Sequence, residues 1–171
     1  MHQASRIFSK WSAYFLLALL SALLQLMIFP RLPGSIPQTA LVAAILIGMF
    51  NGVPGGVIMG CVIGLLCDAM IPRVEAYHTL MMMAAGGGAG FLCTKYMNKN
   101  LWTALLQTAS ATTVFGFFFF LFFILPVGRG DWISLYHITL PQIIITTLSV
   151  PPLYLLFRGV HRWFGEERST E

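Results

Sequence analysis

Long apolar runs, separated by short polar or proline- and glycine-rich segments, make up nearly the whole chain. Only 9% of the 171 residues are charged and 57% are hydrophobic, whereas an average soluble domain carries about 25% charged residues. A soluble domain of this length has more surface than so few charges can cover, so much of the surface must face lipid. The sequence therefore predicts an all-α integral membrane protein, with a single membrane domain over residues 1–171.

Prolines, glycines and charges divide the apolar sequence into six expected membrane spans. The clearest breaks are PRLPGSIP, the tight turn NGVPGG, KYMNKN and PVGRGDW. The expected spans are residues 11–29, 37–53, 55–71, 78–96, 101–125 and 136–157. The second is short for a hydrocarbon core that needs about 20 helical residues. The sixth contains Pro141 and the pair Pro151-Pro152, which predict a bend or an interruption.

The basic residues predict the orientation of these spans. With the N-terminus in the cytoplasm, the cytoplasmic segments contain Arg6, Lys10, Lys95, Lys99, Arg158, Arg162 and Arg168. The outer segments contain only Arg31, Arg73 and Arg129. Because Lys and Arg accumulate on the cytoplasmic side of membranes, this distribution predicts that both termini are cytoplasmic. Trp11, Trp102, Trp132 and Trp163 lie near expected span ends, where interfacial anchors belong.

One carboxylate stands out in the apolar stretch GCVIGLLCDAM, which ends the third span. In the expected orientation Asp68 lies in the last helical turn, near the outer interface, where an acid costs less than at the bilayer centre. The negative end of its own helix dipole disfavours an anion there, so we expect Asp68 to seek a cation. Arg73 is the first candidate partner and His78 the second. The alternative is a hydrated interfacial carboxylate without a structural role.

Glycines at every fourth position favour a structural role for this carboxylate. Gly56, Gly60 and Gly64 form one smooth face of the third span, and Asp68 continues their spacing. We therefore expect Asp68 to project from a helix-packing seam rather than toward lipid. The run AAGGGAG in the fourth span, with Gly86 and Gly90, offers a matching surface. Simple helix packing is the favoured interpretation of that run, since a phosphate-binding loop would need a preceding strand and a following lysine.

The motif and its setting resemble MreD, the membrane component of the bacterial rod-shape machinery, or elongasome. The resemblance rests on GCVIGLLCDAM, with Gly60, Gly64, Leu65, Leu66 and Asp68, and on the preceding NGVPGG turn. Family members usually continue with a glycine-containing loop, whereas MIPRVEAYHT contains no glycine. The resemblance implies a fold similar to the substrate-binding S components of energy-coupling-factor transporters. It also implies binding to MreC and, indirectly, to MreB, RodA and a class B penicillin-binding transpeptidase.

The sequence contains little that indicates catalysis. It has no H-E-x-x-H or G-x-S-x-G motif, and Asp68 and Asp131 are a poor match to an intramembrane aspartyl pair. Cys61, Cys67 and Cys93 all lie in apolar runs and fit buried apolar side chains better than a disulfide or metal site. The expectation is a non-enzymatic scaffold of cell-wall elongation in the bacterial inner membrane, with neither cofactor nor metal, in which Asp68 fixes the corner between the third and fourth spans.

The alternative function is a substrate-capture S component of a vitamin transporter. Gln25, Gln107 and Gln142 could line a small-molecule pocket, and Ala18 and Ala22 match the A-x-x-x-A spacing of S components. A lone six-span chain has no ATP site and no relay of linked carboxylates, so such a subunit would depend on other subunits for energy.

Two further segments are open to interpretation. The phenylalanine run in FGFFFFLFFIL faces lipid or a partner, and the basic tail FRGVHRWFGEERSTE suits an anionic inner leaflet.

Overall fold

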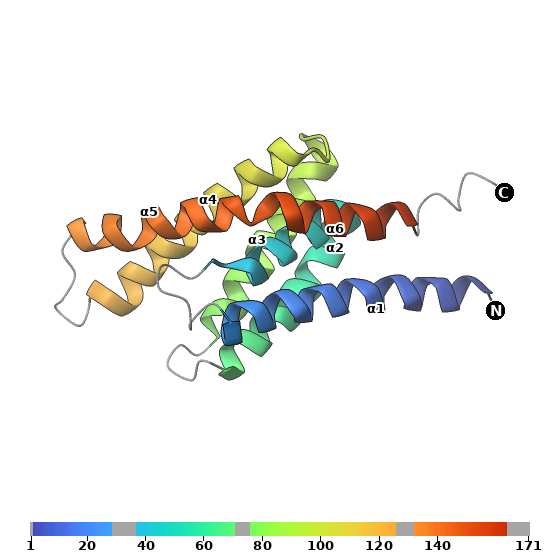
Figure 1. Cartoon of the computed structure of the whole chain (residues 1–171), viewed down its shortest axis with the longest axis horizontal. Coiled ribbons are helices and arrows are strands. Elements are labelled where there is room, and N and C mark those ends of the chain that lie inside the picture. Colours follow the sequence, from blue (N-terminus) through green and yellow to red (C-terminus); the bar gives the residue numbers. More distant parts are fainter. Residues whose placement is uncertain (1, 29–36, 71–75, 126–131, 164–171) are drawn as a thin grey trace.

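The computed structural model describes residues 2–28, 37–70, 76–125 and 132–163. All regular secondary structure in these ranges is helical (Figure 1). In chain order the elements are α1 (His2–Leu23), the π-helical segment η1 (Leu24–Ile28), α2 (Thr39–Met70), α3 (Tyr77–Lys95), α4 (Leu101–Phe119), the π-helical segment η3 (Phe120–Ile124), α5 (Trp132–Leu148) and α6 (Val150–Trp163).

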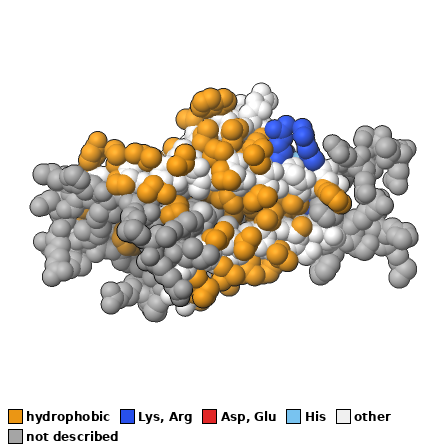
Figure 2. All heavy atoms as spheres, viewed as in Figure 1, with side chains coloured by type: hydrophobic (Ala, Val, Ile, Leu, Met, Phe, Trp, Pro, Cys, Tyr) orange, Lys and Arg blue, Asp and Glu red, His pale blue; other side chains and the backbone are white. Residues whose placement is uncertain are grey.

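Within the described residues, four helical stretches are long and apolar enough to cross a membrane. They are Ser9–Met27, Thr39–Met70, Leu101–Phe122 and Thr139–Trp163. The surface agrees with this character, because hydrophobic side chains cover much of the described part of the face shown in Figure 2. The expected all-α, membrane-type architecture is therefore found, and the division into six spans is not shown by these stretches.

Helix α2 is not one straight rod, because the chain reverses at Gly52. This residue has φ 80° and ψ −174°, a conformation outside the helical region, and Pro54 follows. A Cβ placed on Gly56 would lie 2.8 Å from the Cα of Gly48. In a continuous helix these two residues would be about 12 Å apart along the axis. The break falls in the NGVPGG segment where the sequence predicts a turn, and it separates a first arm (residues 39–51) from a second arm (residues 53–70).

The first arm of α2 forms the centre of the molecule. Every residue from 37 to 50 is buried, and α2 contacts α1, α3, α4 and α6. A helix surrounded in this way must be apolar on all sides, and LVAAILIGMF meets that requirement. The arm is also short, with about 13 helical residues and a length of roughly 20 Å.

Side chains from other helices satisfy the buried start of the first arm. The Gln25 Oε1 accepts a hydrogen bond from the Ala40 N–H at 2.9 Å, and the Thr146 Oγ1 accepts one from the Gln38 N–H at 3.0 Å. The Thr39 hydroxyl donates to the Ser21 carbonyl at 2.7 Å. Because the first backbone N–H groups of a helix have no partner within it, these bonds allow the helix to begin inside the protein.

The far end of the first arm is held by the turn between α3 and α4. The Lys99 Nζ donates to the Phe50 carbonyl at 3.1 Å, and the Tyr154 hydroxyl of α6 donates to the Lys99 carbonyl at 3.0 Å. A cation at the C-terminus of a helix is favoured by the helix dipole. The buried arm is therefore fixed at both ends by residues far from it in sequence.

The beginning of α1 and the end of α6 lie at the same end of the molecule (Figure 1). The Tyr14 hydroxyl and the His161 Nδ1 are 3.3 Å apart, and the Tyr14 and Phe157 rings stack with centroids 6.0 Å apart. The sequence predicts a bend or an interruption in the span over residues 136–157, and the structure divides this region between α5 and α6 at Ser149. Pro151 and Pro152 fall in the first turn of α6, where a missing N–H costs least.

Candidate functional site

The second arm of α2 and α3 run antiparallel and touch through their backbones. A Cβ on Gly60 would lie 2.7 Å from the Met82 carbonyl carbon, and one on Gly64 would lie 2.8 Å from the Thr79 nitrogen. One on Gly90 would lie 2.6 Å from the Val53 nitrogen. Real Cβ atoms are essentially never found at such distances, so only glycine fits. We call this contact the glycine seam and define it by Gly56, Gly60, Gly64, Gly86 and Gly90.

A sixth glycine, which was not predicted from the sequence, brings three helical segments together at the seam: the two arms of α2 and α3. Gly48 of the first arm also lies against the Gly86 backbone, as Gly56 does from the second arm. The signal was present, because Gly48, Gly52 and Gly56 repeat every fourth residue. It was hidden by the expectation that residue 48 belonged to a separate span.

Asp68 ends the seam by accepting four hydrogen bonds from the start of α3. Its Oδ1 accepts from the His78 N–H at 3.0 Å and lies 2.9 Å from the His78 Nδ1. Its Oδ2 accepts from the Thr79 N–H at 3.0 Å and from the Thr79 hydroxyl at 2.6 Å. We call these three residues the Asp68 clasp.

The Asp68 clasp supplies the N-terminal cap that α3 lacks. Ala76, the residue before α3, has a left-handed conformation with φ 58° and provides no side-chain cap. The Asp68 carboxylate takes over this role from α2 and places its charge at the positive end of the α3 dipole. Only 11% of the Asp68 side chain is exposed, which argues against the hydrated, unattached carboxylate.

His78, the second candidate partner, is the residue that the structure brings to Asp68. The first candidate, Arg73, lies outside the described residues. The expected partner of Asp68 was a cation, whereas the structure also gives its carboxylate two backbone N–H groups at a helix start.

An aromatic contact extends the clasp to α4. The Tyr77 hydroxyl donates to the Phe115 carbonyl at 2.5 Å, and the two rings meet edge to face with centroids 4.9 Å apart. The His78 ring lies 5.6 Å from the Phe115 ring. The phenylalanine run therefore does not present a single face. Phe115 and Phe120 are buried, while Phe117 is exposed.

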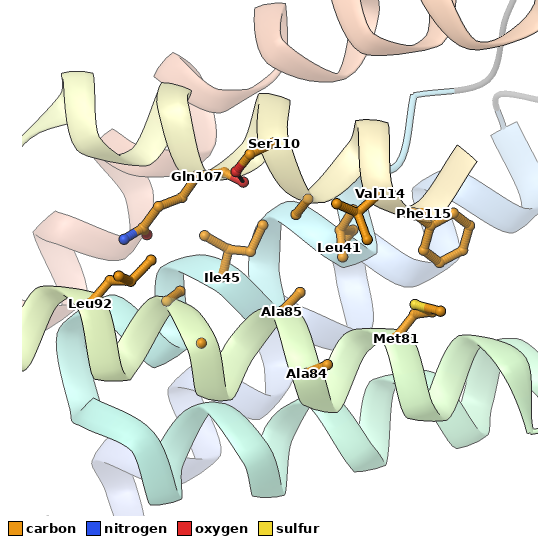
Figure 3. Close-up of a pocket in the computed structure, with 13 residues that line it drawn as sticks. Leu41, Ile45, Met81, Ala84, Ala85, Leu92, Gln107, Ser110, Val114 and Phe115 are labelled. Carbon is orange, nitrogen blue, oxygen red and sulfur yellow. Dashed lines mark hydrogen bonds between the residues drawn. The ribbon is translucent and has the colours of Figure 1, made fainter. Parts of the chain in front are cut away.

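A groove of about 250 Å³ separates the remainder of α3 from α4. Figure 3 shows its two walls, with Ala84 and Ala85 on α3 and Ser110 and Val114 on α4, above a floor formed by α2. We call it the α3–α4 groove. Its lining is mainly small or apolar and consists of Leu41, Ile45, Met81, Ala84, Ala85, Gly88, Ala89, Leu92, Gln107, Ser110, Ala111, Val114 and Phe115.

Two features of the groove suggest an occupant. Gly88 is exposed, and a Cβ placed on it would meet nothing within 4 Å, so this glycine serves no packing contact in the described structure. Gln107 is 6% exposed, and its Nε2 makes only long contacts to sulfur, 3.4 Å to the Cys93 Sγ and 3.9 Å to the Met97 Sδ. Its Oε1 accepts no hydrogen bond from the described residues.

The other sequence candidates do not gather into one site. The Gln25 side chain accepts a hydrogen bond from the Ala40 N–H, and Gln142 is half-buried on α5. Ala18 and Ala22 are buried in the core. The cysteines are free, and Cys67 and Cys93 are buried. Across residues 2–28, 37–70, 76–125 and 132–163, no three His, Cys, Asp or Glu side chains are grouped so as to hold a metal. Glu75 and Asp131 lie outside these ranges.

Comparison with known proteins adds no assignment. No protein-family model, curated protein or solved structure matches the chain. The fold and the site define an all-helical protein of membrane-type composition with a glycine-packed hairpin at its centre.

Proposed function

We propose that this protein is a non-enzymatic membrane scaffold of the MreD type, which holds together components of the machinery for lateral cell-wall synthesis. Its direct partner is an MreC-like protein with a single membrane anchor. MreB, RodA and a class B penicillin-binding transpeptidase are reached through that partner. The proposal starts from the resemblance in GCVIGLLCDAM and gains support from the packing role of those same residues.

The α3–α4 groove is the observation that carries the proposal. Small residues on both walls, including Ala84, Gly88 and Ala111, allow another helix backbone to approach closely. The buried Gln107 Oε1 lacks a donor, and an acyl chain of a lipid has none to offer. A membrane helix with a Ser, Thr, Asn or Gln facing the groove would fill the space and supply the hydrogen bond. We therefore assign the groove to the membrane anchor of the partner.

The Asp68 clasp has a supporting part in this proposal. It fixes α3, one wall of the groove, to the end of the α2 hairpin, and Tyr77 and Phe115 fix the other wall to the same point. The scaffold thus presents a groove whose walls are set before the partner arrives. A preformed groove binds more tightly because less conformational freedom is lost on binding.

The proposed topology has six crossings with both termini in the cytoplasm of a bacterial cell. The two arms of α2 and α3 count as three of these crossings. The first arm, roughly 20 Å long, reaches only part of the way through a hydrocarbon core of about 30 Å. This is tolerable because the arm is surrounded by protein and its ends are capped by Gln25 and Lys99.

The test uses two exposed glycines in a matched pair. Gly88 lines the groove and Gly159 lies on α6, and a Cβ on either one would meet nothing within 4 Å. Gly88→Leu should fill the groove and reduce co-purification of a co-expressed MreC-like protein at least tenfold, while Gly159→Leu should leave it unchanged. Thermal stability in detergent should not fall in either variant. Equal recovery of the partner with both variants would refute the groove as its docking site.

In the alternative function, that of an S component, the same groove is the substrate-binding site. A cavity of about 250 Å³ with one buried amide could hold a small molecule rather than a helix. Native mass spectrometry of the purified protein distinguishes the two functions. A bound molecule of vitamin size that Gly88→Leu displaces would favour the S component, whereas a complex with the MreC-like protein that the same variant disrupts would favour the scaffold.

A further inference from the structure

Four exposed cations gather at the end of the molecule that contains the α3–α4 turn and the end of α6. Lys95 and Lys99 belong to the end of α3 and the turn, and Arg158 and Arg162 to the last two turns of α6. We call this surface the basic end. Figure 2 shows a cluster of Lys and Arg side chains on the described surface, without acidic side chains among the coloured residues of that face.

Two cations of the basic end, Lys99 and Arg158, are held by contacts between elements. Tyr154 is buried, its hydroxyl bonds to the Lys99 carbonyl, and the Arg158 guanidinium lies over its ring at 6.0 Å from the centroid. The Lys99 Nζ is directed to the Phe50 carbonyl at 3.1 Å, and the Phe50 ring stacks on His161 at 5.0 Å. These contacts link α2, the α3–α4 turn and α6, so Lys99 and Arg158 keep fixed relative positions. The Lys95 Nζ lies over the Phe91 ring of α3, 5.1 Å from its centroid.

Exposed aromatic side chains flank the same surface. Trp102 is 78% exposed at the start of α4, and Trp163 is 78% exposed at the end of α6. Tyr96, in the α3–α4 turn, is 73% exposed. Tryptophan and tyrosine favour the headgroup region of a bilayer. In a bilayer whose headgroups surround these rings, the cations lie at the level of the lipid phosphates.

The described residues provide no carboxylate to balance these charges. Asp68 is the only Asp or Glu within the described ranges, and it is engaged in four hydrogen bonds to the start of α3, the opposite end of that helix from Lys95. A group of cations beside interfacial aromatics fits an anionic lipid better than a zwitterionic one, because only the anionic headgroup carries a net charge.

We propose that the basic end binds the headgroup of an anionic phospholipid, with Lys95 and Arg158 contacting its phosphodiester. The exposed Trp102 and Trp163 rings pack along the glycerol and upper acyl region. This lipid site is independent of the α3–α4 groove and of its occupant. Each cation near an anionic lipid surface contributes about a fivefold change in affinity. Removing the charges of both Lys95 and Arg158 should therefore weaken binding roughly 25-fold.

The experiment titrates the full-length protein, in nonionic detergent, with phosphatidylglycerol, phosphatidylcholine or inorganic phosphate and measures apparent Kd. Phosphatidylglycerol should bind more tightly than phosphatidylcholine, and inorganic phosphate should neither bind nor compete. Arg158→Gln should raise the Kd for phosphatidylglycerol about fivefold, and the double variant with Lys95→Gln about 25-fold. Arg158→Lys, which keeps the charge, and Asn98→Gln, an uncharged exposed site in the same turn, should bind like the wild type.

Several results would overturn the proposal. Wild-type affinity in the double variant would show that these cations do not form the site. Equal binding of both lipids would remove the role of charge, and binding of inorganic phosphate at the same affinity would assign the surface to a free anion. A salt titration of the wild-type protein gives a check that requires no variant, because an affinity for phosphatidylglycerol that is insensitive to ionic strength would contradict an electrostatic site.

Discussion

Replacing Asp68 with alanine should loosen the corner between α2 and α3 without preventing membrane insertion. The change removes the acceptor of four hydrogen bonds, two of them from the backbone N–H groups of His78 and Thr79. Loss of a helix cap costs about 0.5–2 kcal/mol, and leaving a buried donor unpaired costs about 1–3 kcal/mol. Relief of the unfavourable position at the end of its own helix returns a few tenths of a kcal/mol. We expect a net loss of about 2–4 kcal/mol in the free energy of unfolding.

Titration of the purified protein with SDS in mixed micelles, followed by tryptophan fluorescence, measures this loss. Asp68→Asn retains one carbonyl acceptor and should lose about half as much. Thr79→Val removes only the bond from the Thr79 hydroxyl and should lose about 1 kcal/mol. A cap predicts that Asp68→Ala is destabilised most, Asp68→Asn less and Thr79→Val least. Unfolding of Asp68→Ala at the wild-type SDS fraction would refute this reasoning, as would a loss no larger than that of Thr79→Val.

Three further variants test the packing of the hairpin and the groove. Gly52→Ala should destabilise the protein by about 1–3 kcal/mol in the same titration, because φ 80° with ψ −174° is a conformation that only glycine adopts readily; an unchanged midpoint would argue against the reversal. Gly60→Val should cost at least about 1–3 kcal/mol through collision with the Met82 carbonyl, and a tolerated valine would contradict the seam. Gln107→Leu should leave the isolated protein as stable as the wild type or more so, because it removes a buried acceptor without a partner; a loss above about 1 kcal/mol would show that the amide has a partner within the protein.

The features of the fold that the sequence could predict are those that depend on residues close together in the chain. The scarcity of charge predicts a membrane-type helical protein, and NGVPGG predicts the break that the structure has at Gly52. The spacing of Gly56, Gly60 and Gly64 places them on one face of a helix, and the structure packs that face on α3. Asp68 falls on the same face because it continues a spacing of four residues, close to the helical period.

The parts that the sequence could not predict depend on contacts between distant segments. The bond from Lys99 to the Phe50 carbonyl joins residues 49 positions apart, and no local pattern indicates it. The same holds for the α3–α4 groove, which Gln107 helps to line. The repeat of Gly48, Gly52 and Gly56 is a local pattern, but it does not indicate that Gly48 meets Gly86. Helix counts are also difficult to predict, because a buried arm capped by other helices can be much shorter than a span that faces lipid.

In the proposed topology the second arm of α2 and α3 both cross the bilayer, which places the Asp68 clasp and the α3–α4 turn on opposite faces. Cysteine labelling in sealed vesicles measures this directly. In a variant with Cys61, Cys67 and Cys93 replaced by alanine, single cysteines are placed at the exposed residues Ala76 and Asn98. A membrane-impermeant maleimide added to vesicles of known orientation should label position 76 only from the outside and position 98 only from the cytoplasmic side. Labelling of both positions from the same side would contradict the account.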